Sequence, residues 1–330
     1  MNSYNIDVAV LLIFFSRPDS FSKVFEQVKL ARPSKLFLYQ DGPRKNRPSD
    51  IENIAKCREI AEDIDWDCEV FKLYQEENKG CDPSEFIAIK WAFSHVEECI
   101  ILEDDDVPSQ SFFPYCKELL DKYKNDERIN MICGMNLCGV TENVSSSYLF
   151  SRCSSIWGWA SWRRVIDTWE GDYAFLDDEE SMSLLKDNLD HNYHVSFDSL
   201  INYAKRHRET GREHYESILA CNRNLNGRLN IVPKYNMITN IGTMDESTHN
   251  VGDINLLPKG IRRVFHMERY EIDTPLKHPK YVLENYRHAE KHMRILAINH
   301  PWVKRYRAFE ARFYNLKKRI VKFFLKKTKR

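Results

Sequence analysis

The chain has no pair of cysteines in a C-x-x-C spacing, although it contains nine cysteines in 330 residues. Structural zinc sites depend on closely spaced thiols, so a zinc cage is not expected. The cysteine number is odd, the spacings are irregular, and most of the thiols stand inside apolar runs. Unpaired cysteines of this kind read as small buried hydrophobic residues. Their use is typical of a reducing compartment, and we expect a cytoplasmic protein.

Long apolar runs and an excess of one charge are also absent. The most apolar run near the start, Val8–Phe15, has eight residues and is too short to cross a bilayer. Asp7 precedes this run and no basic segment does, so we predict a buried strand and not a signal peptide. The 49 basic and 49 acidic residues cancel, so no global charge favours a nucleic acid partner.

Strand and helix patterns alternate through the first hundred residues. Strands are predicted at Val8–Phe15, Lys35–Tyr39, Cys68–Tyr74 and Cys99–Leu102, and helices at Asp19–Ala31, Ile51–Ile64 and Pro83–His95. Farther along, we expect a helix at Ser109–Lys124, strands at Ile129–Met135 and Leu229–Val232, mainly helices over Phe175–Asn224, and a loop over Asn236–Asn250. Nearly continuous apolar strands that alternate with helices indicate an α/β protein whose mostly parallel sheet has helices on both faces.

Polar residues follow three of the predicted strands at the point where each strand ends. They are Ser16-Arg17 after the first strand, Gln40-Asp41 after the second and Glu103–Asp106 after the fourth. Ligands of such sheets bind beyond the carboxyl ends of the strands, so we expect these groups to converge on one site.

The acidic run Glu103–Asp106 suits the transfer of a sugar from a nucleotide diphosphate. The departing diphosphate carries negative charge, which a divalent cation held by carboxylates neutralises. The alternative is a solvated acidic turn that caps the next helix, because most acidic runs lie at the surface. Four adjacent acids beyond a buried strand repel one another unless a cation compensates, which favours the functional interpretation.

An ordered set of motifs resembles GT-A fold glycosyltransferases, in particular bacterial family 2 enzymes and N-acetylglucosaminyltransferase I. The acidic segment ILEDDDVPSQSFF is similar to their metal-binding segment, and FFSRPDS and YQDGPR are similar to their first two strand ends. ENKG precedes the helix before the acidic segment, and SSIWGWASWRRVID and GRLNIVPKYNMITNIGTMDESTHN come after it, in the order that the family has. The resemblance therefore covers roughly residues 6 to 250. It implies a GT-A (Rossmann-like) fold, a UDP-sugar donor, and Mn²⁺ or Mg²⁺ as cofactor.

The resemblance also implies roles for individual residues at the donor site. Arg17 and Asp41 would lie at the nucleotide, Asp104 at the ribose or the metal shell, and Asp105 would be the direct metal ligand. Glu103 would brace the cluster. Asp106 stands where the family pattern often has an apolar residue, and its role is left open.

An inverting transfer needs a carboxylate that takes the proton of the acceptor hydroxyl. In the family this acid begins a helix before the late strand, which selects Glu216 as the base, with Asp172 and Asp245 as alternates. An exposed acid at a helix start is equally explained by the helix dipole. His249 would complete the metal shell if it is not a surface loop histidine.

Tryptophans are concentrated on the acceptor side of the predicted site. Trp157, Trp159 and Trp162 flank Gly158, and flat aromatic faces stack on sugar rings where a glycine allows close approach. Core packing explains at least two of the three equally well. We select Trp157 and Gly158 as the pair at the donor sugar.

The C-terminus carries an aromatic stripe at alternating steps of four and three residues, typical of one face of a long helix. Its members are Trp302, Tyr306, Phe309, Phe313, Leu316, Ile320 and Phe323. Basic residues occupy the other faces, so the helix is predicted either to rest on anionic lipid or to pack on the body or a second copy. We expect residues 1–135 to bind the nucleotide-sugar, 136–255 to bind acceptor and catalyse, and 256–330 to form a helical basic extension.

Together these features predict a metal-dependent, inverting glycosyltransferase. It would move a sugar from a UDP-sugar to a glycan or lipid-linked glycan in surface polysaccharide synthesis, in the cytoplasm or at the inner face of the membrane. A sugar-phosphate nucleotidyltransferase is the first alternative, but those enzymes usually carry a glycine-rich loop after the first strand, where this chain has Ser16-Arg17-Pro18-Asp19. A non-catalytic carbohydrate- or membrane-binding protein is the second alternative.

Overall fold

The computed structural model describes residues 5–190, 196–242, 254, 257–298 and 300–327 of the chain. A central sheet of eight strands has the order β3-β2-β1-β4-β8-β6-β9-β7, and a second sheet pairs β10 with β5. The central strands are β1 (Ile6–Phe14), β2 (Pro33–Gln40), β3 (Glu69–Tyr74), β4 (Glu98–Glu103), β6 (Ile129–Cys133), β7 (Tyr148–Ser151), β8 (Trp159–Trp162) and β9 (Leu229–Pro233). The small sheet consists of β5 (Asp106–Pro108) and β10 (Ile238–Asn240).

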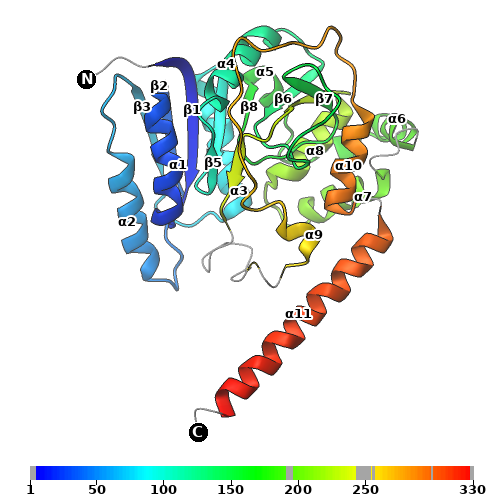
Figure 1. The fold of residues 1–330 in the computed structure, drawn as a ribbon. Coiled ribbons are helices and arrows are strands. Elements are labelled where there is room, and N and C mark those ends of the chain that lie inside the picture. Colours follow the sequence, from blue (N-terminus) through cyan, green and yellow to red (C-terminus); the bar gives the residue numbers. More distant parts are fainter. Residues whose placement is uncertain (1–4, 191–195, 243–253, 255–256, 299, 328–330) are drawn as a thin grey trace.

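Helices cover both faces of the central sheet (Figure 1). One face carries α1 (Pro18–Ala31), α2 (Ser49–Ala61) and α4 (Phe112–Tyr123). The other carries α3 (Cys81–His95), α5 (Arg163–Ile166), α6 (Glu179–Asp190), α7 (Phe197–Arg208) and α8 (Tyr215–Leu225). The short α9 (Lys259–Arg262), then α10 (Tyr286–Leu296) and α11 (Pro301–Lys327), form the helical C-terminal part. The predicted fold class, a mostly parallel α/β sheet with helices on both faces and a helical extension, is confirmed.

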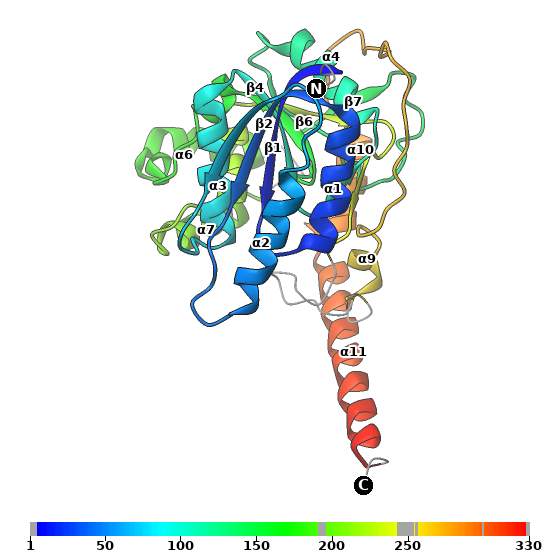
Figure 2. The ribbon, with the colours of Figure 1, turned by 90° about the vertical axis from the view of Figure 1, so that its left-hand side faces the viewer.

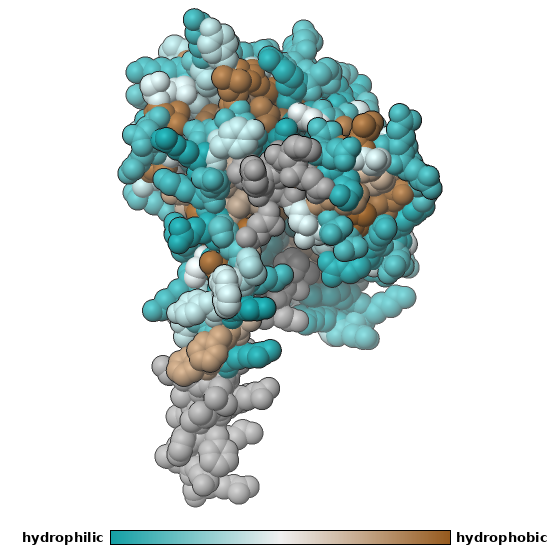
Figure 3. All heavy atoms as spheres, turned by 90° about the vertical axis from the view of Figure 1, so that its right-hand side faces the viewer, coloured by the Kyte–Doolittle hydropathy of each residue, from teal (hydrophilic) through white to brown (hydrophobic). Residues whose placement is uncertain are grey.

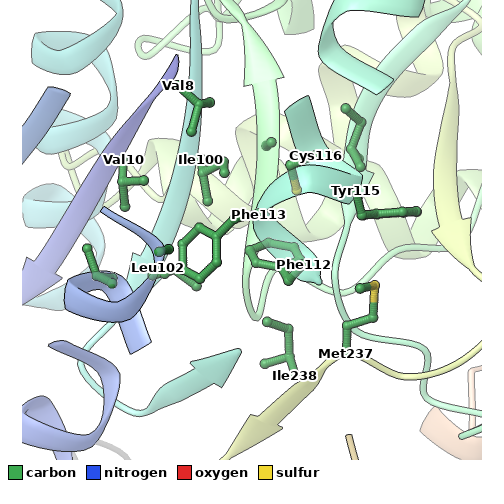
Figure 4. Packing of buried hydrophobic residues seen from close by; sticks show 14 of the residues in the cluster. Val8, Val10, Ile100, Leu102, Phe112, Phe113, Tyr115, Cys116, Met237 and Ile238 are labelled. Atoms are coloured by element: carbon green, nitrogen blue, oxygen red, sulfur yellow. The ribbon is translucent and has the colours of Figure 1, made fainter. Parts of the chain in front are cut away.

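The apolar run of β1 is continuous because both of its faces are buried. Its even-numbered residues from Val8 to Phe14 pack against α1 and α4, and its odd-numbered residues from Ala9 to Ile13 pack toward α3. Figure 4 shows how side chains from β4, α4 and β10 meet in the first of these layers: Leu102, Phe112, Phe113 and Ile238. This packing fixes where each central strand ends and so positions the polar residues that follow.

Two antiparallel strands depart from the parallel pattern expected from the sequence. β8 lies between β4 and β6 and is antiparallel to both, and β7 is antiparallel to β9 at the sheet edge. Both belong to the Ser-, Gly- and Trp-rich segment over residues 136–169, whose irregular pattern did not predict strands. The loop predicted over Asn236–Asn250 is wrong for Ile238–Asn240, which form β10. Residues 243–250 lie outside the described residues.

All nine cysteines lie in the described part of the chain and are free thiols, six of them buried. This agrees with the prediction that they are structural. Among the helices that the structure describes, none is both long and apolar enough to cross a membrane.

Gly158, just before β8, combines a left-handed backbone with a tight contact. Its φ is +65°, and a Cβ built on it would lie 2.5 Å from Ile238 Cδ1, inside the core. Gly211 has nearly the same φ, +66°, but a Cβ there would meet open space. The two glycines therefore separate backbone strain from steric clash.

We expect Gly211→Ala to lower the free energy of unfolding by about 1 kcal/mol through backbone strain alone. Gly158→Ala is expected to cost about 2 kcal/mol more, because Ile238 is fully buried and has to be displaced. Urea unfolding of the two variants and the wild type measures the difference. Equal losses in the two variants would contradict the predicted clash.

Candidate functional site

Arg17 joins the ends of two neighbouring strands. β1 and β4 pair in parallel with Ile13 opposite Glu103, so the residues that follow them leave the sheet side by side. The Nη1 of Arg17 donates to Asp105 Oδ2 at 2.7 Å, and Nε and Nη2 both donate to Asp104. Burial lowers the pKa of Arg17, but the charges and hydrogen bonds of Asp104 and Asp105 together have a larger effect and raise this pKa above the ordinary arginine value. The predicted convergence of the first and fourth strand ends is present.

Asp41 directly follows β2 and fixes the loop that leads into α3. Its carboxylate accepts the backbone N–H groups of Gly42, Lys79 and Gly80 at 2.9, 2.8 and 3.1 Å, and the side-chain amide of Asn78 at 2.7 Å. Burial raises the pKa of Asp41, while the backbone donors act in the opposite direction. The second strand end is thereby connected to the start of α3.

These strand ends and the start of α3 enclose one pocket. Its walls include Phe15, Arg17, Asp41, Arg44, Ser84, Glu85, Glu103 and Asp104. The guanidinium of Arg44 lies 5.0 Å from the centre of the Phe15 ring and forms two hydrogen bonds with Asp50, at 2.7 and 2.6 Å. The pocket lining thus contains both cations and carboxyl groups, which suits a ligand with both phosphate and hydroxyl groups.

Glu103 points to the opposite face of the sheet from Asp104. Strand alternation turns it, like Cys99 and Ile101, toward the layer of α3 and α8. There Tyr215 Oη lies 3.4 Å from Glu103 Oε1, and Glu85 of α3 is close enough for its charge to act on Glu103. Burial first, and then the neighbouring carboxylates, raise the pKa of Glu103 well above its ordinary value.

Glu85 is a buried acid of the pocket that sequence reasoning missed. It accepts a hydrogen bond from the Cys81 thiol at 3.4 Å. Burial raises its pKa well above the ordinary value, and the charges of Asp82, Glu216 and Asp105 add to the effect. A signal was present in the sequence, because a helix that follows a parallel strand starts at the same sheet edge as the strand ends.

Asp106, whose role was left open, braces the site. It is fully buried in β5, and its carboxylate accepts the N–H of Gly158 at 2.9 Å and the Asn240 amide at 3.0 Å. The same Asn240 amide donates to Asp105 Oδ1 at 2.9 Å. Asn240 and the pairing of β5 with β10 were both missed, and together they set the position of Asp105. Gly242 also lies directly against the Asp105 carboxylate, where a side chain would clash.

Glu216, predicted from the sequence as the catalytic base, lies near the pocket but outside its wall. Glu216 is exposed in the first turn of α8, next to Tyr215, and its Oε2 lies 3.4 Å from Tyr203 Oη. It is near enough to raise the pKa of Glu85, but it is not among the described residues that line the pocket. The alternate Asp172 is exposed and accepts the N–H of Ala174 at 3.2 Å. Asp245 and His249 lie outside the described residues.

The three tryptophans separate into one partly exposed and two buried residues. Trp159 and Trp162 are core residues of β8, and the Trp162 indole donates to the Leu120 carbonyl at 3.1 Å. Trp157 is partly exposed and packs on Phe265, with ring centres 5.2 Å apart. Neither Trp157 nor Gly158 is among the described residues that line the pocket, but Gly158 contacts the acidic motif through Asp106.

The acidic cluster fits a hard divalent cation. Burial raises the pKa of Glu103, Asp104 and Asp106, and repulsion between neighbouring carboxylates adds to the effect, so a bound cation would favour the charged forms of these groups. Within the described residues, no three His, Cys, Asp or Glu side chains form a complete ion site. Mg²⁺ is commonly held by one or two carboxylates together with substrate phosphates, which matches this partial donor set. A cation at Asp105 Oδ2 would replace the bond from Arg17.

The raised pKa of Glu85 gives a pH-dependent stability. As the pH rises above the ordinary glutamate pKa, the unfolded chain loses this proton before the folded protein does, so stability falls with rising pH. We expect Glu85→Gln to raise the melting temperature at pH 8 by about 2 to 4 °C, equivalent to about 1 kcal/mol, and to change it little at pH 4. The exposed Glu59→Gln in α2 is the control, with no effect at either pH. A gain of equal size at both pH values would contradict the titration.

The fold and pocket define an α/β protein with a polar site at the carboxyl edge of a mostly parallel sheet. No protein-family model and no curated protein matches the chain. Among solved structures it is similar to 4-diphosphocytidyl-2C-methyl-D-erythritol synthase from Anaerococcus prevotii, with 10% identity and a TM-score of 0.29 over 48% of this chain and 73% of that one. It is also similar to a UDP-glucose pyrophosphorylase complexed with UDP-glucose, with 15% identity and a TM-score of 0.25 over 44% of this chain and 62% of that one. Both likenesses are too weak to assign a family.

Proposed function

We propose that the protein is a glycosyltransferase that moves a sugar from a UDP-sugar to a glycan or lipid-linked glycan acceptor, with Mn²⁺ or Mg²⁺ as cofactor. The observation that carries the proposal is the Arg17–Asp104–Asp105 cluster beside a pocket formed by the ends of β1, β2 and β4 and the start of α3. Synthesis of a surface polysaccharide is the process that this reaction would serve.

Different residues would bind different parts of the UDP-sugar donor. Arg17 and Arg44 would place positive charge near the diphosphate. Asp41 holds the loop against which the uracil ring of the nucleotide would lie. Asp105 would hold the divalent cation, with His249 as its second proposed ligand. When bound, that cation would neutralise the charge that develops on the leaving diphosphate. Asp104 would lie at the ribose or in the metal shell, and Glu103 would support the acidic cluster beside the donor sugar.

The transfer itself would break the bond between the anomeric carbon and the diphosphate oxygen and form a bond to the acceptor oxygen. Glu216 would take the proton of the acceptor hydroxyl, since it is exposed to solvent and its charge reaches the pocket acids. Trp157 and Gly158 would contact the sugar from the side of β8. Attack from the side opposite the diphosphate would invert the anomeric centre.

Calorimetric titration of UDP with and without Mn²⁺ tests the donor site, with GDP and CDP as nucleotide controls. We expect binding of UDP only in the presence of the metal. Donor UDP-sugars are then incubated with acceptor glycans and the transferred sugar is measured; in a separate reaction a sugar phosphate is incubated with UTP and the released pyrophosphate is measured. Sugar transfer without pyrophosphate supports the proposal, whereas pyrophosphate release from a sugar phosphate and UTP would identify a nucleotidyltransferase. Failure to bind any nucleotide would favour a non-catalytic binding protein.

A further inference from the structure

The first half of the long helix α11 turns the aromatic residues of its stripe away from the body of the protein. Four side chains along one face are more than half exposed: Trp302 (76%), Tyr306 (65%), Phe309 (68%) and Phe313 (56%). The helix extends from the body in both ribbon views (Figures 1 and 2), and Figure 3 shows apolar side chains at the surface of its described part. A stripe of this size at helical spacing normally packs against a partner.

The face of α11 that packs on the body is, in contrast, largely polar. Arg307 lies against Gly260 of α9, and Tyr314 lies under the guanidinium of Arg262 at 5.6 Å. Glu310 is buried on the same face and accepts the Tyr314 hydroxyl at 3.1 Å. Polar contacts therefore hold the start of the helix, and the aromatic face remains available to something outside the chain.

The charge of the C-terminal segment distinguishes between two candidate partners, a second copy of the chain and an anionic surface. Residues 301–330 contain twelve Lys or Arg and one acid, Glu310, a net charge of +11. Since the whole chain has no net charge, residues 1–300 carry −11. Two such helices side by side would repel each other. An anionic surface would attract the helix and repel the body, so that the helix alone makes contact.

The position of α11 also suits a surface contact. The helix extends from the end of the molecule at which β1 finishes, the edge that carries the candidate pocket (Figures 1 and 2). Exposed Lys304, Arg305 and Arg312 flank the aromatic stripe, and Arg305 lies 5.2 Å from the Trp302 ring. Aromatic rings bordered by cations are the side chains that interfacial helices place at the level of lipid headgroups.

We propose that α11 binds the surface of an anionic lipid bilayer, with its aromatic stripe in the headgroup region and its basic residues on the lipid phosphates. This contact goes beyond the proposed transfer reaction and does not depend on it. It would bring the pocket edge of the protein close to a membrane, where lipid-linked substrates reside.

Sedimentation of the full chain with lipid vesicles tests the proposal. Vesicles of phosphatidylcholine alone are compared with equal parts of phosphatidylcholine and phosphatidylglycerol, at low and high salt. We expect binding only to the anionic vesicles, and weaker binding at high salt. The pair Lys304→Gln and Arg312→Gln should lower the partition coefficient about 25-fold, because each basic charge contributes about fivefold. The pair Tyr306→Ser and Phe309→Ser should also abolish most of the binding.

Control variants with substitutions on the body show whether vesicle binding depends on α11 in particular or on exposed basic and apolar residues in general. Lys122→Gln with Lys124→Gln removes two exposed charges at the end of α4, and Leu184→Ser removes an exposed apolar side chain of α6. Both controls should bind like the wild type, and all variants should keep the wild-type melting temperature. No preference for anionic vesicles, or equal losses in the controls, would overturn the proposal. Self-association in light scattering that only the helix variants abolish, without vesicle binding, would instead identify a second copy as the partner.

Discussion

Replacing Asp105 with asparagine is expected to lower the affinity for UDP in the presence of Mn²⁺ by about 100-fold or more. Loss of a residue that merely supports a metal ligand costs about 10- to 100-fold, so loss of the ligand itself should cost at least as much. The substitution keeps the shape of the side chain and its contact with Asn240, so the fold should be retained. Calorimetry with and without the metal measures the effect.

Asp126→Asn is the matched control for this experiment. Asp126 also forms an ion pair, with Arg128 at 2.6 Å, but in the turn after α4 and away from the pocket. Its replacement should leave metal-dependent UDP binding unchanged. Wild-type affinity in the Asp105 variant would remove Asp105 from the proposed metal site, whereas equal losses in both variants would point to a general effect on folding.

Replacing Glu216 with glutamine is expected to lower kcat by about 100- to 10,000-fold, the range by which a positioned general base accelerates a reaction. UDP binding should be unchanged, because Glu216 lies on α8 outside the pocket wall. Transfer rates at saturating donor and acceptor, together with UDP calorimetry, test both statements. Loss of kcat without loss of UDP binding distinguishes a base from a residue that shapes the donor site.

Glu209→Gln, in the exposed turn after α7, is the control and should retain full activity. If Glu216→Gln is as active as the wild type, the base lies elsewhere. Asp172→Asn and Asp245→Asn then identify the alternate carboxylate by the same kcat measurement.

The sequence was most informative where one pattern extended over many residues. The buried strands β1, β2 and β4 have continuous apolar runs, so their ends could be predicted, and with them Arg17, Asp41 and the acidic motif. The parallel arrangement of these strands was enough to bring Arg17 to Asp104 and Asp105.

The parts of the site that the sequence did not predict lie in segments too short to show a periodic pattern. β5 and β10 have three residues each and are held by their pairing and by side chains such as Asn240, which no periodicity reveals. β8 is antiparallel inside a mostly parallel sheet, and its segment is rich in Ser, Gly and Trp, so local preference did not indicate a strand. Glu85 looks like an ordinary acid near a helix start until tertiary packing buries it.

The hydrogen bonds of Asp41 have a consequence for how this protein can vary among its homologues. The carboxylate binds Lys79 through its backbone N–H and not its side chain, so residue 79 is free to change in identity. Gly80 donates from a backbone with φ of +91°, which restricts that position mainly to glycine. One inserted or deleted residue between Asn78 and Gly80 would shift the donors of this loop relative to Asp41, whereas the N–H of Gly42 would stay in place. Substitutions at position 79 should therefore be common among homologues of this chain, and changes of loop length there should be rare.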